Sequence, residues 1–126
     1  MSGREILVDT NILIYLMGGD RSIQQILQGK VIYISFVTEL ELIGMNLPKV
    51  SDLLKVKAIL SDAIILPLNE LIKDHYRRVR GNYRLKLPDS VIAATSIAYR
   101  LPFLSADRQF SVVKDLPLYN LNRGSV

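Results

Sequence analysis

The chain has 126 residues, of which 49% are hydrophobic and 22% are charged, and this balance fits one globular domain over residues 1–126 rather than a disordered chain. It has no cysteine, which excludes disulfides, thiolate zinc sites and cysteine nucleophiles and suits a reducing, cytoplasmic location. The net charge of +4 favours a polyanionic partner, and no apolar run is long enough for a membrane span or a signal peptide.

In chain order, short apolar runs bounded by Gly, Pro or Asp predict strands, and longer runs with helical spacing predict helices. The predicted strands are Glu5–Val8, Val31–Ser35, Ile64–Leu66, Phe103–Ser105 and Leu118–Tyr119. The predicted helices are Asn11–Met17, Ser22–Gln28, Val37–Leu47, Ser51–Ser61, Glu70–Tyr83 and Asp89–Tyr99, with a helical turn near Arg108–Val113. This alternation predicts an α/β fold in which helices cover both faces of a parallel sheet.

Four acidic residues fall at the carboxyl edge of this predicted sheet, which is where such folds bind ligands. Asp9 and Asp107 directly follow the first and fourth strands. Glu41 lies about one turn into the helix after the second strand, and Asp89 opens the helix that runs back against the fourth strand. Strand order decides whether the four carboxylates also meet laterally.

The chemistry of such a cluster follows from its charge and its oxygen ligands. Crowded carboxylates repel one another unless a cation neutralises them. Oxygen ligands without histidine or cysteine favour Mg²⁺ or Mn²⁺ over zinc, as one ion or as two ions about 4 Å apart. A metal held in this way lowers the pKa of a bound water and positions it for in-line attack on a phosphodiester.

Three of these acidic residues also have a purely structural interpretation. Asp9 can end a strand, with Thr10 or Asn11 as the N-cap of the next helix. Asp89 suits the first turn of a helix because a negative charge there favours the helix dipole. Asp107 can cap a helix or occupy a turn.

The fourth acidic position has two candidates, Glu39 and Glu41, which lie on opposite sides of one helix, so that only one can face a site. Glu39 falls on a polar strip that predicts a solvated surface. Glu41 falls among Val37, Gly44 and Met45, in largely apolar surroundings. A carboxylate buried there needs a reason such as a metal, and this favours Glu41.

Four segments carry a resemblance to a known family. They are Leu7-Val8-Asp9-Thr10-Asn11, Ile34-Ser35 followed by Thr38 and Glu41-Leu42, Leu87-Pro88-Asp89 running into Ile92-Ala93-Ala94-Thr95-Ser96, and Leu104-Ser105-Ala106-Asp107 followed by Phe110. In their order and spacing, and over nearly the whole length, the chain resembles the PIN-domain nucleases. Within that family it is similar to the VapC-type toxins of toxin–antitoxin pairs.

The resemblance implies a three-layer α/β/α sandwich with a four- or five-stranded parallel sheet, and divalent-metal-dependent cleavage of RNA to 5′-phosphate and 3′-hydroxyl ends. It implies a catalytic and metal-binding quartet at Asp9, Glu41, Asp89 and Asp107. Supporting polar residues are implied at Asn11, Thr38 and Ser105. Gln109 stands where the last motif often carries another aspartate, which puts a fifth acidic ligand in doubt but not the quartet. A homodimer and an inhibitory antitoxin protein are further implications.

A basic and aromatic segment immediately precedes Asp89. Its candidate RNA-binding residues are Arg77, Arg78, Arg80, Arg84, Lys86 and Tyr83. Arginine binds phosphates and stacks on bases, and tyrosine stacks as well. The alternative is a solvated helix face whose arginine stems lie along the surface.

Two other functions stay open at this point. A non-catalytic RNA-binding or partner-binding module would have the fold without the cleavage, but the presence of all four acidic positions argues against it. A PIN-like RNA-processing nuclease would cleave RNA without an antitoxin, and the short chain favours the toxin over this second alternative. A phosphoryl-transfer domain fits less well, because haloacid-dehalogenase-type phosphatases have a second Asp where this chain has Asn11.

Overall fold

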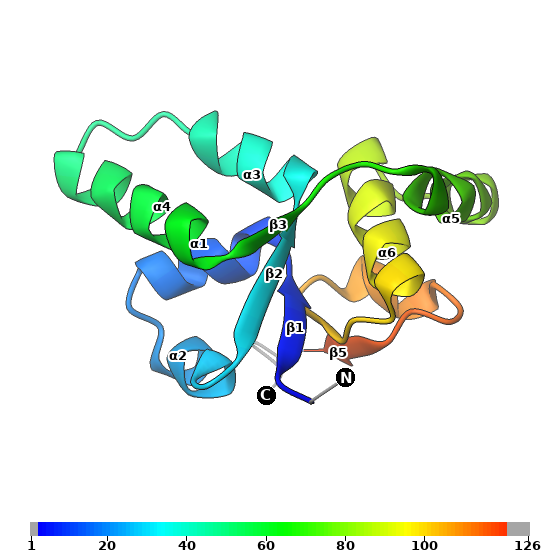
Figure 1. Ribbon diagram of the computed structural model, residues 1–126, viewed down its shortest axis with the longest axis horizontal. Helices are drawn as coiled ribbons and strands as arrows, with labels where there is room; N and C mark the ends of the chain where they lie inside the picture. Colours follow the sequence, from blue (N-terminus) through cyan, green and yellow to red (C-terminus); the bar gives the residue numbers. More distant parts are fainter. Residues whose placement is uncertain (1–2, 121–126) are drawn as a thin grey trace.

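The computed structural model describes residues 3–120, and these residues form a five-stranded parallel sheet between two layers of helices (Figure 1). The strands are β1 (Glu5–Val8), β2 (Val31–Ser35), β3 (Ile64–Leu66), β4 (Phe103–Ser105) and β5 (Leu118–Asn120). Their order across the sheet is β3-β2-β1-β4-β5, and every neighbouring pair is parallel. The predicted α/β sandwich and its parallel sheet are therefore confirmed.

The chain changes its direction across the sheet at β1. From β1 it adds β2 and then β3 on one side, and it later places β4 and β5 on the other side. Leu7 in the middle of the sheet pairs with Tyr33 of β2 and with Phe103 of β4. Open parallel sheets bind ligands at the carboxyl ends of the strands where the strand order reverses. That point lies between β1 and β4.

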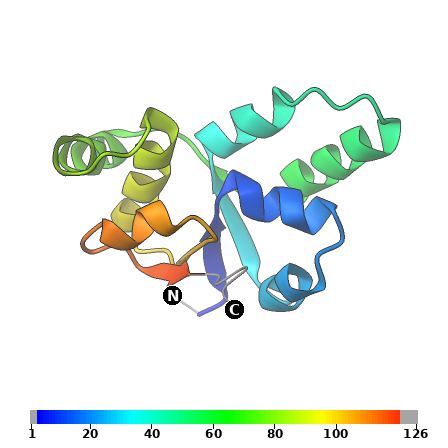
Figure 2. The same cartoon turned by 180° about the vertical axis from the view of Figure 1, so that it is seen from behind.

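The helices divide between the two faces of the sheet (Figures 1 and 2). One face is covered by α1 (Thr10–Met17), α2 (Arg21–Leu27), α3 (Phe36–Ile43) and α4 (Val50–Asp62). The other face is covered by α5 (Glu70–Asn82), α6 (Leu87–Tyr99) and the 3-10 helix η1 (Arg108–Val112). No helix within residues 3–120 is long and apolar enough to cross a membrane.

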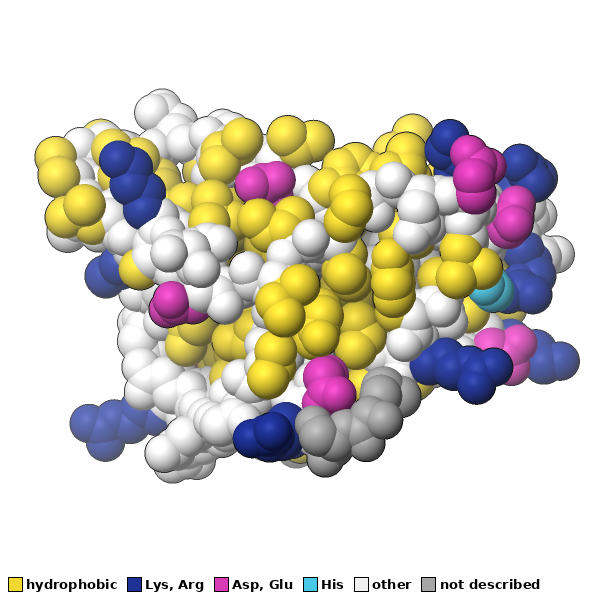
Figure 3. Space-filling view, in the orientation of Figure 1, with side chains coloured by type: hydrophobic (Ala, Val, Ile, Leu, Met, Phe, Trp, Pro, Cys, Tyr) yellow, Lys and Arg dark blue, Asp and Glu magenta, His cyan; other side chains and the backbone are white. Residues whose placement is uncertain are grey.

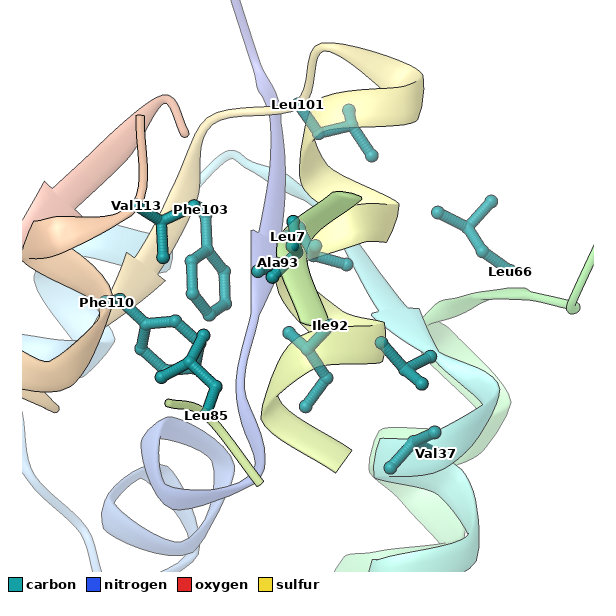
Figure 4. Close-up of a cluster of buried hydrophobic side chains, with 12 residues drawn as sticks. Leu7, Val37, Leu66, Leu85, Ile92, Ala93, Leu101, Phe103, Phe110 and Val113 are labelled. Carbon is teal, nitrogen blue, oxygen red and sulfur yellow. The ribbon is translucent and has the colours of Figure 1, made fainter. Parts of the chain in front are cut away.

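Alternate residues of the central strands supply two separate hydrophobic cores, as expected for strands that are buried on both faces. Val8 and Leu104 pack on the side of α1, whereas Leu7 and Phe103 pack on the side of α6. In the core on the side of α6, the rings of Phe103 and Phe110 meet edge to face, with centroids 4.9 Å apart (Figure 4). These two cores hold the strand ends in fixed positions beneath the edge of the sheet.

Two predicted helix boundaries differ from the structure by more than one residue. α3 ends at Ile43 rather than at Leu47, and the backbone N–H of Gly44 closes it by donating to the Leu40 carbonyl at 3.0 Å. The following residues approach Pro48, and a residue before proline disfavours the helical conformation. α6 begins at Leu87 with proline in its first turn, so Asp89 lies inside that turn rather than at the helix start.

Candidate active site

A pocket of about 460 Å³ opens at the carboxyl ends of β1 and β4, and all four predicted carboxylates line it. These are Asp9, Glu41, Asp89 and Asp107. The rest of the lining comes from Thr10, Asn11, Ile14, Leu40, Gly44, Met45 and Ile92. The sequence left open whether the four carboxylates meet laterally. The strand order brings them together, because β1 and β4 are neighbours in the sheet. Of the three supporting polar residues, Asn11 lines the pocket, whereas Thr38 and Ser105 are fully buried.

Asp9 is held through both of its carboxylate oxygens. It is only 6% exposed, and its Oδ1 accepts the backbone N–H of Ile12 at 3.0 Å. Its Oδ2 accepts a hydrogen bond from the Ser105 hydroxyl. Asp9 is therefore itself the N-cap of α1, and the alternative that assigned this cap to Thr10 or Asn11 is wrong. The side chain of Asp9 thus both caps α1 and lines the pocket.

Ser105 links the ends of the two central strands. While its hydroxyl donates to Asp9, its Oγ accepts the backbone N–H of Asp107 at 3.0 Å. Asp107 in turn caps η1, because its Oδ1 accepts the backbone N–H of Gln109 at 2.9 Å. The Gln109 side-chain amide also lies 3.4 Å from the other carboxylate oxygen. Gln109, which stands where the family's last motif often carries an aspartate, thus donates hydrogen bonds to Asp107.

Glu41 lines the pocket, but the burial predicted for the two glutamates of this helix is wrong. Its side chain is exposed, whereas Glu39, predicted to be solvated, is half-buried and does not line the pocket. The Glu41 Oε1 accepts a hydrogen bond from the Thr10 hydroxyl at 2.5 Å. Thr10 is a pocket residue that sequence reasoning considered only as a helix cap. Its position directly after Asp9 indicates that it lies near the carboxyl edge of the sheet, but nothing in the sequence pairs Thr10 with Glu41.

The pKa values of two carboxyl groups respond to burial and to their neighbours. Burial raises the pKa of Asp9, and repulsion from Asp107 and Asp89 adds to this, while the hydrogen bonds from Ser105 and Ile12 oppose it. These effects require that the carboxylates lie close enough to interact electrostatically.

Burial also raises the pKa of Asp89, followed by repulsion from Asp107 and Glu41, and the positive charge of Lys86 acts in the opposite direction. Within residues 3–120, no side chain or backbone N–H donates a hydrogen bond to the Asp89 carboxylate. Each carboxylate of the pocket therefore contributes to an excess of negative charge that hydrogen bonds offset only in part.

The oxygen-rich acidic part of the pocket fits a hard divalent cation in its chemistry. A cation would relieve the repulsion that, after burial, contributes to the raised pKa values of Asp9 and Asp89. Among the residues that the structure describes, no three His, Cys, Asp or Glu side chains are already arranged as ligands of one ion. The four carboxylates are therefore candidate ligands that share a pocket, not a closed coordination shell.

The six candidate RNA-binding residues lie on the C-terminal half of α5 and in the turn to α6, and none lines the pocket. Three of them have partners near their own helix. Arg77 forms an exposed ion pair with Asp74 at 3.5 Å, and the Arg78 guanidinium lies 2.6 Å from His75 Nδ1. Arg80 donates to a backbone carbonyl in the turn after α5. These contacts fit the alternative of a solvated helix face for this part of the segment.

The other three candidates lie in the turn itself. The Tyr83 hydroxyl accepts the backbone N–H of Lys114 at 2.9 Å, so this ring is fixed against the chain rather than free to stack. Arg84 and Lys86 are exposed. Lys86 precedes the first turn of α6 and is near enough to Asp89 to lower its pKa. Of the six candidates, Lys86 is thus the one whose charge acts on a carboxylate of the pocket.

Comparison with known proteins identifies the sequence profile of the PIN domain, which matches residues 6–116. No curated protein sequence matches the chain. A solved toxin–antitoxin complex from Klebsiella pneumoniae contains a chain that is 29% identical, with 92% of this chain and 99% of that chain covered and a TM-score of 0.76. VapBC2 from Rickettsia felis, bound to a promoter DNA fragment, is 19% identical, with 94% and 99% covered and a TM-score of 0.78. FitAcB from Neisseria gonorrhoeae is 22% identical, with 91% and 96% covered and a TM-score of 0.75.

Proposed function

We propose, since this chain belongs to the PIN domain family, that it is a divalent-metal-dependent endoribonuclease and the toxin of a type II toxin–antitoxin pair. The family is one of nucleases, which gives the reaction class. The observation that carries the proposal is the placement of Asp9, Glu41, Asp89 and Asp107 around one pocket at the carboxyl edge of the sheet. Four repelling carboxylates in a pocket call for a cation, and a cation beside a phosphodiester supports hydrolysis.

The residues of this chain would have the following roles in the reaction. The four carboxylates would hold one or two Mg²⁺ or Mn²⁺ ions, which supply an activated water and neutralise charge on the phosphodiester. Ser105 and the start of α1 hold Asp9 in one orientation. Asp107 is fixed in the same way by the start of η1. Such preorganisation removes the need to reorient these ligands during the reaction.

Basic residues at the start of α6 indicate where RNA would approach, because the charge of Lys86 acts on the Asp89 carboxylate. Arg84 and Lys86 are exposed beside the first turn of α6, which carries Asp89. Their positive charge would attract the phosphates on either side of the cleaved bond. Arg77 and Arg78, which contact residues of their own helix, are weaker candidates for this role.

The toxin assignment is supported by the solved relatives. The Klebsiella pneumoniae protein of similar length is part of a toxin–antitoxin complex, and nearly the whole of that chain aligns with this one. We accordingly propose that an antitoxin protein binds this chain and that the pair acts in the cytoplasm.

We also propose that two copies associate. Apolar side chains are exposed at Ile64 of the edge strand β3, and at Leu68, Leu71 and Leu87, of which Leu68 and Leu87 line one hollow. Figure 3 shows hydrophobic side chains gathered over the middle of the face on which β3 lies. A patch of this kind on a small protein favours association. Sedimentation of the wild type and of Leu68→Glu tests it, with a dimer expected only for the wild type.

The nuclease proposal is tested by incubating purified protein with tRNA, rRNA and single-stranded RNA in Mg²⁺, in Mn²⁺ and in EDTA. The same panel is run on Asp9→Asn and Asp89→Asn, and on Asp62→Asn as a matched control. Asp62 is an exposed aspartate at the end of α4 that does not line the acidic pocket. We expect cleavage that needs metal, is lost in the two pocket variants and is retained in the control.

Other outcomes would point elsewhere. Folded, metal-loaded protein that cleaves no RNA would favour a binding module. Cleavage that survives EDTA and both pocket substitutions would place the reaction at another site. Growth arrest on expression of the wild type, but not of Asp9→Asn, separates a toxin from an RNA-processing nuclease.

A further inference from the structure

We propose that Thr10 is a positioning residue that holds the Glu41 carboxylate at the pocket, within a chain of hydroxyls that runs from Thr38 through Thr10 to Glu41. The expected effect on catalysis rests on the proposed nuclease function, but the positioning itself does not. The proposal assigns a role to a pocket residue that is also the first residue of α1. It concerns this chain's own groups and is independent of which ion the pocket takes.

The geometry places the Thr10 hydroxyl between two partners on α3. Its Oγ1 lies 2.5 Å from Glu41 Oε1 and 3.3 Å from Thr38 Oγ1. A hydroxyl has one proton, and an ionised carboxylate only accepts hydrogen bonds. Thr10 therefore donates to Glu41, which leaves Thr38 as the donor in the contact between the two hydroxyls. Thr38 is fully buried, so this inner end of the chain is shielded from water.

Glu41 depends on this contact more than the strand-end carboxylates do. Asp9 is held by the Ile12 N–H and the Ser105 hydroxyl, and Asp107 by the Gln109 N–H. Glu41 is exposed, and its longer side chain loses more rotamer freedom when it is fixed. Within the described part of the chain, residues 3–120, the Thr10 hydroxyl is the only group that donates a hydrogen bond to its carboxylate.

The contact also connects two parts of the site. Asp9 caps α1, and Thr10 is the first residue of that helix, so the cap sets where the Thr10 hydroxyl lies. Thr10 then reaches across to α3, which carries both Thr38 and Glu41. The placement of a helix-borne carboxylate is thus determined by the same helix start that fixes the buried Asp9.

The test compares Thr10→Val, which removes the hydroxyl at nearly constant shape, with Thr10→Ser, which keeps it. Thr95→Val is the matched control, because it removes a buried threonine hydroxyl that bonds the Val91 carbonyl of its own helix. The first readout is the set of scalar couplings that report the Glu41 χ1 rotamer in metal-free protein. The second is the affinity for Mn²⁺ by calorimetry, and the third is kcat and KM for RNA cleavage.

We expect a single Glu41 rotamer in the wild type, in Thr10→Ser and in the control, and averaged couplings in Thr10→Val. Mn²⁺ affinity and kcat should fall by about 10-fold to 100-fold in Thr10→Val, as for other residues that orient metal ligands. KM for RNA should change little, because we do not expect Thr10 to contact the bound RNA. Rescue by serine separates the hydroxyl from a general effect of altering the helix start.

A single Glu41 rotamer together with wild-type Mn²⁺ affinity in Thr10→Val would overturn the proposal. If the wild type cleaves no RNA, the nuclease assignment fails, and the couplings still decide whether Thr10 positions Glu41. If Thr10→Val does not fold, Thr10→Ala provides the same comparison without a β-branched residue at this position.

Discussion

The carboxylates that follow strands and those carried by helices are held in different ways. Asp9 and Asp107 each cap the helix that they precede, and Ser105 joins them. Glu41 is held by a hydroxyl from another helix, and no hydrogen-bond donor within residues 3–120 reaches Asp89. The backbone itself needs the first pair, since their oxygens satisfy free N–H groups. The second pair has no such structural role, so its positions depend on side-chain contacts and on mutual repulsion.

The largest effect on activity should come from removing a strand-end charge. We expect Asp9→Asn to lower metal-dependent cleavage by more than about 100-fold, because even residues that only orient ligands have effects up to this size. Stability of the metal-free protein should be unchanged or increased, since Asn caps a helix about as well as Asp and a buried charge is lost. Cleavage assays and urea unfolding measure both. A loss of stability of more than about 1 kcal/mol would mean that the cap depends on the charge.

Breaking the link between the strand ends should have the next largest effect. We expect Ser105→Ala to lower cleavage by about 10-fold to 100-fold. It should also lower the free energy of unfolding by about 1–3 kcal/mol, because a buried Asp9 oxygen loses its donor. Ser96→Ala is the matched control, since the buried Ser96 hydroxyl donates to the Leu101 carbonyl at 2.7 Å, away from the pocket. Equal losses of activity in the two variants would argue against a special role for Ser105.

The raised pKa values predict how stability changes with pH. The pKa of Asp9 is raised above its ordinary value of 3.8, mainly by burial, so between that value and the folded-state pKa the folded protein binds more protons than the unfolded chain. The free energy of unfolding of the wild type relative to Asp9→Asn should therefore fall as the pH rises through this window. Urea unfolding in EDTA at a series of pH values measures the difference. A relative stability that rises with pH would show that the hydrogen bonds outweigh burial.

The smallest expected effect concerns the basic turn. Lys86→Ala should weaken RNA binding and reduce the slope of log affinity against log salt concentration by about 0.7, as for the loss of one contact to single-stranded nucleic acid. Arg77→Ala should change the slope less, because this side chain is paired with Asp74 on the exposed face of α5. Fluorescence titrations on the inactive Asp9→Asn background measure both. A larger change for Arg77→Ala would move the RNA path to α5.

The strands and the strand-end part of the site follow from local sequence. Short β-branched runs placed four of the five strands at their observed bounds, and β5 extends one residue further, to Asn120. Asp9 and Asp107 then follow directly from the rule that parallel strands end at one edge. Strand order depends on how the helices pack on the two faces, and no local pattern reports it.

The parts that sequence did not predict are contacts between side chains on different elements. The sequence pattern places Glu41 on a buried helix face, whereas the structure shows an exposed side chain that accepts a hydrogen bond from Thr10. The helix that carries it is also shorter than predicted, because Gly44 closes it before Pro48. Helical periodicity describes the faces of a single helix, whereas the distance from Thr10 to Glu41 depends on how α1 and α3 pack.

The double attachment of Asp9 has a genetic consequence. One of its oxygens caps α1, and the other accepts a hydrogen bond from Ser105. An asparagine at this position can still cap the helix. A single substitution at this codon should therefore silence the enzyme and leave a protein that folds, accumulates and keeps its binding surfaces. Such an allele would not behave as a deletion. Under the proposed function, its product would continue to occupy RNA and an antitoxin, and would compete with active copies in the same cell.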